Sequence, residues 1–282
     1  MLFEKVLLAT DYSPAAELLF QCLPELKNFG MKEVVLTHVA DTHSGGGNTP
    51  EFQAHNEQKL KVYKKQLEEM GLRVTVKVPI GFIGEEINRI ADTEKVSLIL
   101  MGSHGKGIIQ RRLLGSSTTD ILRKSTTPVL VEKCRKTENN QCEAFCQQKF
   151  LKMLIPTDFS VHADKMIQVI KQATNLQDVV LLSVIEEGES TEEVEKKKSE
   201  LEAKLKTLQQ EFEDLNFTVA TKVREGAASD NILQLANEEN VTVIAIPKKG
   251  ATNMKELLMG STADTVIRKS KIPVLVFPVQ NT

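Results

Sequence analysis

Three glycines and a run of hydroxyl side chains are the part of the 282-residue sequence best suited to chemistry. Gly102 and Gly105 follow an apolar run that ends at Met101, and Gly115 comes ten residues later. The hydroxyl run directly after Gly115 consists of Ser116, Ser117 and Thr118. Glycine lets backbone N–H groups approach an anion closely, and a helix N-terminus favours phosphate oxygens. The pattern predicts a phosphate-binding loop that is neither a Walker A loop nor a Rossmann fingerprint.

Polar residues also follow the first apolar run of the sequence. Thr10 and Asp11 come directly after residues 5–9, and Ser13 with the next proline is typical of a helix start. Asp11 is interpreted as a ligand-binding carboxylate, with a helix-entry turn as the alternative. His104 lies inside the glycine loop, but no carboxylate partner for it is identifiable. We therefore expect no catalytic residue here.

Strand-length apolar runs alternate with helical patterns through the first half of the chain. The predicted strands are residues 5–9, 33–39, 72–78, 96–101 and 128–131. Near-continuous apolar strands indicate a sheet covered on both faces, which is typical of a parallel sheet. The prediction is an α/β fold of doubly wound, five-stranded parallel sheets flanked by helices. Ligands of such sheets bind at the carboxyl ends of the central strands, where the glycine loop and Asp11 would meet.

The second half of the chain repeats the first. Residues 115–131 align with residues 260–276 at an offset of 145, with nine identities in seventeen positions. We predict one domain over residues 1–134, a linker over residues 135–149 and a second domain over residues 150–282. Cys134, Cys142 and Cys146 lie around the linker, and their spacing favours reduced thiols over a metal or redox site.

Composition narrows the class of protein. A formal net charge of -2 and 26% charged residues indicate a globular protein without bulk attraction for nucleic acid or membrane surfaces. No apolar run is long enough to cross a membrane, and the first residues do not form a signal peptide pattern. We expect a cytoplasmic protein that binds neither nucleic acid nor membranes.

The spacing Gly102-x2-Gly105-x9-Gly115-Ser116 resembles the nucleotide motif of the universal stress protein family. The resemblance extends over both halves, so the chain resembles a tandem universal stress protein with the Rossmann-like, adenine nucleotide alpha hydrolase-like fold. It implies an ATP or AMP ligand, with Mg or Mn beside a triphosphate. The residues it implies for nucleotide binding in the first half are Thr10, Asp11, Val39, Met101, Gly102, His104, Gly105, Gly115, Ser116, Ser117 and Thr118.

The same resemblance implies how the halves associate. Family members commonly dimerise through their last strands, so residues 128–131 and 273–276 are expected to pair as an internal pseudodimer. A homodimer of whole chains is a further possibility left open by the sequence.

The second half departs from the motif at Pro247, which replaces Gly102. Proline lacks an N–H and adds a ring, so we expect the nucleotide to be held mainly in the first half. The candidate residues of this second site are Asp158, Val184, Gly250, Gly260, Ser261 and Thr262. Lys248 and Lys249 could attract phosphate, but we expect loop lysines to be solvated.

Three functions remain open at the level of sequence. The first is a stress-response regulatory protein that binds adenine nucleotide mainly in its first domain. The second is a slow ATPase or autophosphorylating protein acting through Ser116 or Ser117, although no general base is evident. The third is a binding module for another ligand or for a protein.

Two segments have minor alternative interpretations. Residues 42–50 could form a lid over the site. Residues 192–215 could form a coiled-coil seam, but packing of this helix on the sheet is favoured.

Overall fold

The computed structural model describes residues 3–41, 50–103, 114–136, 142–144, 148–173, 176–186, 190–250 and 259–279. Its internal contacts divide the chain into two compact units, residues 1–147 and residues 148–282. Each unit buries its own apolar core around the strands of a parallel sheet.

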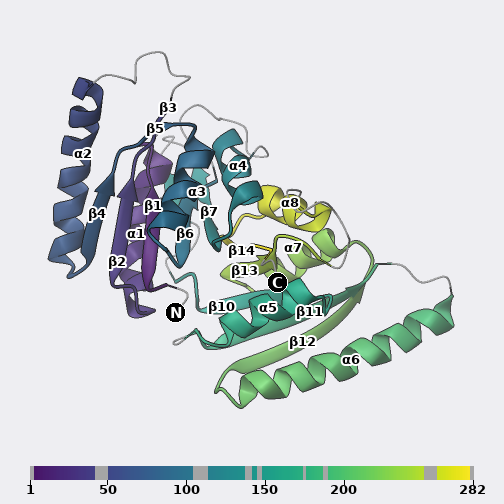
Figure 1. Ribbon diagram of the computed structural model, residues 1–282. Helices are drawn as coiled ribbons and strands as arrows, with labels where there is room; N and C mark the ends of the chain where they lie inside the picture. Colours follow the sequence, from purple (N-terminus) through teal and green to yellow (C-terminus); the bar gives the residue numbers. More distant parts are fainter. Residues whose placement is uncertain are drawn as a thin grey trace. The chain divides into compact units, whose positions relative to one another are not determined.

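The first unit is a doubly wound α/β domain (Figure 1). Its sheet has the strand order β4-β2-β1-β6-β7, with all pairs parallel, and a separate short pair joins β3 to β5. The elements are β1 (Lys5–Ala9), α1 (Pro14–Asn28), β2 (Glu33–Thr37), β3 (Ala40–Asp41), α2 (Pro50–Glu69), β4 (Arg73–Lys77), β5 (Ile80–Gly81), α3 (Ile83–Thr93), β6 (Leu98–Gly102), α4 (Ser116–Lys124) and β7 (Val129–Glu132).

Helices cover both faces of this sheet, which explains why its strands are continuously apolar. Consecutive β1 residues such as Leu7 and Leu8 are fully buried, although their side chains point to opposite faces. The stacked rings of Phe20 and Tyr63 join α1 to α2, and α3 packs against α4. Right-handed crossovers on the two sides of β1 place these two helix pairs on opposite faces.

The second unit repeats the architecture with the strand order β12-β11-β10-β13-β14, again all parallel. Its elements are β10 (Lys152–Pro156), α5 (Val161–Ile170), β11 (Asp178–Ile185), α6 (Thr191–Glu213), β12 (Thr218–Glu225), α7 (Ala228–Glu238), β13 (Val243–Pro247), α8 (Ser261–Lys269) and β14 (Val274–Phe277). The predicted fold of two doubly wound, five-stranded parallel sheets is confirmed.

The long helix α6 lies alongside β12 (Figure 1) and contacts β11 as well. Leu205, Leu208 and Phe212 are buried on its sheet-facing side, so the expected packing on the sheet is confirmed for this part of the stripe. Leu215, which follows the helix, is 49% exposed and does not belong to the buried stripe.

A short antiparallel pair lies where the sequence predicted a linker. β8 (Cys134–Lys136) pairs with β9 (Cys142–Ala144), and β9 contacts α1. The polar composition of this stretch did not predict strands. Cys146 lies outside the described residues, as do residues 42–49 of the proposed lid.

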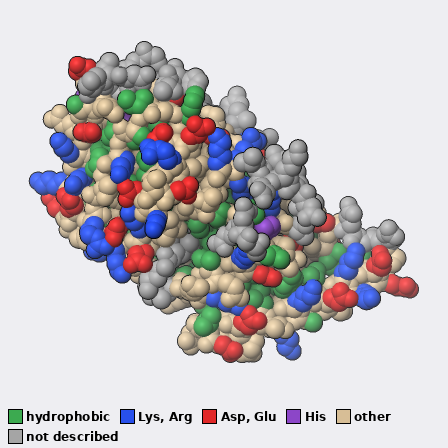
Figure 2. Space-filling model, viewed as in Figure 1, with side chains coloured by type: hydrophobic (Ala, Val, Ile, Leu, Met, Phe, Trp, Pro, Cys, Tyr) green, Lys and Arg blue, Asp and Glu red, His purple; other side chains and the backbone are tan. Residues whose placement is uncertain are grey.

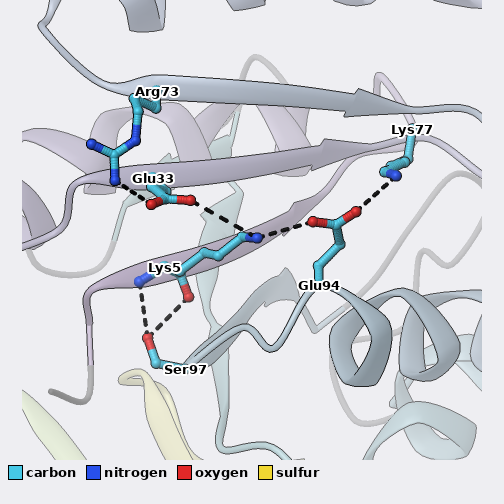
Figure 3. Close-up of polar contacts among 6 residues, drawn as sticks. All are labelled: Lys5, Glu33, Arg73, Lys77, Glu94 and Ser97. Atoms are coloured by element: carbon cyan, nitrogen blue, oxygen red, sulfur yellow. Dashed lines mark hydrogen bonds and ion pairs between the residues drawn. The ribbon is translucent and has the colours of Figure 1, made fainter.

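The repeat extends to the ion pairs of the two units, of which Figure 3 shows those of the first unit. In the first unit the Glu94 carboxylate contacts Lys5 Nζ at 2.9 Å and Lys77 Nζ at 2.7 Å. The second unit reproduces the triad: Glu239 lies 2.9 Å from Lys152 Nζ and 3.7 Å from Lys222 Nζ.

The hydroxyl beside each triad is equivalent as well. Ser97 Oγ accepts from Lys5 N and donates to Lys5 O. Thr242 Oγ1 accepts from Lys152 N in the same way, and it lies 2.9 Å from Lys152 O and 2.7 Å from Lys149 O. The duplication therefore includes the side chains that fix the first strand, in addition to the hydrophobic pattern.

A helix able to span a membrane does not occur among the described residues.

Candidate nucleotide-binding site

The topology of the first sheet brings the predicted site residues to one edge. β1 lies between β2 and β6, and the chain reverses its direction of winding between β1 and β6. Leu8 is paired with Leu100, so Thr10 and Asp11 follow β1 at the edge where Gly102 ends β6. Ligands of doubly wound sheets bind at this switch point.

A rigid turn holds the β1 side of the site. Tyr12 N donates to Thr10 Oγ1 at 3.1 Å, and Ser13 N donates to Asp11 Oδ1 at 2.9 Å. Ser13 then caps α1, because its hydroxyl accepts from Ala16 N at 3.2 Å, as the sequence predicted. Tyr12 has a φ of 59°, a left-handed conformation that is uncommon outside glycine and concentrates at functional sites. The turn fixes the direction of the Asp11 carboxylate.

The β6 side is joined directly to the start of α4. Gly115 N donates to Ser103 O at 3.2 Å, and the Thr118 hydroxyl lies 3.2 Å from Gly102 O. Gly115 is the N-cap of α4, and as a glycine it offers no side chain to cap the helix. The first-turn N–H groups of an α-helix have no acceptor within the helix, so this end of α4 can receive an anion.

The predicted first-unit residues differ in accessibility. Ser116 is exposed and Ser117 is partly exposed at the start of α4, whereas the Thr118 side chain is buried and bonded to Gly102 O. Val39 and Met101 are buried, so their ligand contacts would come from backbone or side-chain edges. His104 and Gly105 lie outside the described residues.

Sequence reasoning missed His38 and Tyr12 as parts of this edge. His38 Nδ1 lies 2.9 Å from Thr10 O, and its ring is 4.5 Å from the Tyr12 ring, centroid to centroid. The Tyr12 hydroxyl donates to Asn56 O of α2, and burial raises the pKa of this hydroxyl. The sequence signal for Tyr12 was the repeat: an aromatic residue directly follows Asp11 in the first half and Asp158 in the second.

The second unit builds the same frame with different side chains. Asp158 Oδ1 accepts from Ser160 N at 3.0 Å, and Phe159 has a φ of 54° in the place of Tyr12. Ser183 Oγ donates to Thr157 O at 2.8 Å, in the place of His38. The remaining candidates follow the same order: Val184 in β11 is partly exposed, Gly260 is the N-cap of α8, and Ser261 and Thr262 begin that helix.

The expectation that Lys248 and Lys249 are solvated is wrong. Their residues are only 4% and 5% exposed. Lys248 N donates to Phe277 O of β14, which continues the ladder one residue past Pro247. Burial, and then the charge of Lys249, lower the pKa of Lys248 to about 8.

Charged side chains of both signs are interspersed on the face of the first unit that Figure 2 shows. Within the described residues, no group of three His, Cys, Asp or Glu side chains is placed to hold a metal ion.

The family model described as "Universal stress protein family" matches residues 2–133 and again residues 149–278. The chain belongs to the universal stress protein family. It is a tandem member, because the model matches each half separately.

Individual relatives agree with this assignment. The chain is 34% identical over 156 residues to universal stress protein MJ0577 of Methanocaldococcus jannaschii, covering 47% of this chain and 96% of the relative. Universal stress protein MJ0531 of the same organism is 30% identical over 147 residues, covering 49% of this chain and 86% of the relative. A crystal structure of a universal stress protein from Archaeoglobus fulgidus matches with a TM-score of 0.75 at 25% identity, covering 99% of this chain and 97% of that chain.

Proposed function

We propose that this universal stress protein is a regulatory protein of the stress response that holds an adenine nucleotide, ATP or AMP, in its first unit. The observation that carries the proposal is the meeting of Asp11, Gly102 and the start of α4, which has a glycine N-cap, at one switch point. Binding of the nucleotide would favour one conformation of the loops around the site. The fraction of protein in that conformation would then depend on the energy state of the cell. The cytoplasm is the proposed location.

Each part of the nucleotide has proposed contacts. Asp11 and the backbone at Val39 lie at the carboxyl ends of β1 and β2 and would hold the base. Gly102, at the end of β6, would face the ribose. Gly115 and the exposed hydroxyl of Ser116 would hold phosphates at the start of α4, where the helix dipole favours negative charge.

A divalent cation, Mg or Mn, is proposed to accompany a triphosphate. Phosphate oxygens and water are ligands that suit Mg²⁺, and a serine hydroxyl such as that of Ser116 has the right chemistry to join them. The cation would neutralise phosphate charge.

The repeat supplies the variant that tests this function. Pro247 is the last residue of β13, and Gly102 is the last residue of the equivalent strand β6. The second unit therefore shows that the fold tolerates proline at this position. Gly102→Pro is expected to preserve the fold and to remove binding of ATP and AMP, measured by titration calorimetry with magnesium. Pro247→Gly is the matched control and should leave the binding of ATP and AMP to the first unit unchanged. Undiminished nucleotide affinity in Gly102→Pro would refute the proposed site.

Two proposals about assembly also follow from the family. The first prediction is that residues 128–131 pair with residues 273–276 inside one chain. The second is that two whole chains associate, which sedimentation of the full chain measures.

A further inference from the structure

We propose that His38 is a positioning residue of the first-unit site: it holds the carbonyl group of Thr10 and thereby orients Asp11 toward the ligand. This role rests on the proposed function, because the ligand is the adenine nucleotide proposed above. His38 does not need to touch the nucleotide. Its effect passes through the peptide bond that joins Thr10 to Asp11.

The hydrogen bond between His38 and Thr10 has a defined direction. The Nδ1 atom of His38 lies 2.9 Å from Thr10 O, and a carbonyl oxygen can only accept, so Nδ1 is the donor. In the neutral ring Nε2 is then the nitrogen without a proton. Protonation of the ring adds a proton at Nε2 and leaves the donor at Nδ1 in place. The Thr10 carbonyl therefore has a donor in both charge states of His38.

The Thr10 carbonyl lies in the peptide plane that precedes Asp11. The atoms of a peptide unit are nearly coplanar, so a bond to the oxygen also restrains the backbone nitrogen of Asp11. Rotation of this plane would turn the Asp11 carboxylate away from the site. Thr10 N donates to Thr37 O at 2.9 Å on one side of the plane. On the other side, Ser13 N donates to Asp11 Oδ1 at 2.9 Å, so the bond from His38 restrains the atoms between these two contacts.

The turn requires such restraints because its next residue is strained. Tyr12 has a φ of 59°, a conformation that a residue other than glycine keeps only where its surroundings impose it. Tyr12 N donates to Thr10 Oγ1 at 3.1 Å, and the ring of Tyr12 lies 4.5 Å from the ring of His38, centroid to centroid. His38 thus contacts the turn twice, through a hydrogen bond and through its ring.

The second unit achieves the same restraint with a different side chain. Ser183 occupies the position of His38, and its hydroxyl donates to Thr157 O at 2.8 Å. Thr157 N donates to Leu182 O at 2.8 Å, and Phe159 N donates to Thr157 Oγ1 at 3.0 Å, as in the first turn. Imidazole and hydroxyl differ in size and shape, and both supply a donor to the threonine carbonyl. We infer that the donor is what the turn requires at this position.

Titration calorimetry of AMP into the full chain tests the role. His38→Ala removes the donor and should weaken AMP binding by about threefold to tenfold, the value of one hydrogen bond. His38→Ser installs the residue of the second unit and should restore the affinity to within about twofold of the parent. His38→Phe keeps a ring beside Tyr12 without a donor and should lose as much affinity as His38→Ala. His55→Ala, which removes an exposed imidazole of α2, is the matched control and should leave the affinity unchanged.

The recovery in His38→Ser separates positioning from packing, because a small hydroxyl cannot replace the packing of an imidazole ring. Affinity equal to that of the parent in His38→Ala or in His38→Phe would overturn the proposal. Affinity in His38→Ser as low as in His38→Ala would overturn it as well.

Hydrogen exchange without nucleotide distinguishes a failure of this role from a failure of the proposed function. The Tyr12 amide should exchange about threefold to tenfold faster in His38→Ala than in the parent and should regain the parent rate in His38→Ser. Ser183→Ala should have the same effect on the Phe159 amide. Unchanged exchange of the Tyr12 amide in His38→Ala would overturn the proposal. If the parent binds no adenine nucleotide while these rates change as expected, the proposed function is refuted and the orientation of Asp11 by His38 is retained.

Discussion

The ammonium group of Lys59 lies over the ring of Tyr12, 5.1 Å from the ring centre. The contact joins α2 to the left-handed turn that orients Asp11. The second unit repeats it, because Lys204 of α6 lies 5.4 Å from the centre of the Phe159 ring. A cation above an aromatic ring thus joins the helix to the site turn in each unit.

Removing this cation should loosen the turn slightly. Lys59→Met keeps the apolar stem and loses the charge, so we expect the free energy of unfolding to fall by about 0.5–1 kcal/mol, the range for exposed cation–π contacts. Chemical denaturation measures the change. Tyr12→Phe is the control: it keeps the ring under Lys59 but loses the hydrogen bond to Asn56 O. If Lys59→Met is as stable as the parent while Tyr12→Phe is not, the hydrogen bond to Asn56 O, and not the cation, stabilises the contact between α2 and the turn.

The ion-pair triads predict how stability responds to acid. Hydrogen bonds from Lys77 and then Lys5 hold the pKa of Glu94 below its ordinary value of 4.5, and a hydrogen bond from Lys152 does so for Glu239. A carboxyl with a lowered folded pKa stabilises the fold above its unfolded pKa. That stabilisation should disappear as the pH falls below about 4.5.

Glutamine substitutions test the assignment. Glu94→Gln and Glu239→Gln should each cost about 0.5–1 kcal/mol at pH 7 and flatten the dependence of unfolding free energy on pH between about 3 and 5. Denaturation curves recorded across this range are the measurement. A slope as steep in the double variant as in the parent would assign the acid response to other carboxyls.

Close packing between α3 and α4 predicts a position that excludes any side chain. A Cβ on Gly84 would lie 2.1 Å from Asp120 Oδ2 and 2.9 Å from Asp120 Cβ, so rotation of the aspartate cannot relieve the clash. Gly84→Ala is expected to cost about 1–3 kcal/mol of unfolding free energy.

Gly260→Ala provides the comparison for Gly84→Ala, because its nearest contacts would be 3.5 and 3.6 Å and its φ is ordinary. Because alanine is a poorer N-cap than glycine, this substitution should cost about 0.5–1 kcal/mol, without the added cost of a clash. Equal effects of the two substitutions in thermal or chemical denaturation would contradict the packing argument.

The fold could be predicted from sequence because its signals are local and repeated. Apolar runs such as residues 5–9 define buried strands, Ser13 marks a helix start, and the offset of 145 residues shows the duplication. The strands of the β8–β9 pair could not be predicted, because polar residues over a short antiparallel pair give no apolar alternation.

The site was predictable only in outline. Glycines and Asp11 mark it through residue type, whereas the contact of His38 with Thr10 O depends on how two strands are paired. Lys248 and Lys249 show the opposite failure. Lysine is usually solvated, so residue type gave no sign that these two residues are buried directly after β13.

The central claim is that the first unit holds one adenine nucleotide, and equilibrium dialysis of labelled AMP against the full chain tests it most directly. We predict that binding saturates at one AMP per chain. Saturable AMP binding should be absent in Gly102→Pro. No saturable binding of AMP or of ATP with magnesium to the unmodified chain would contradict the account.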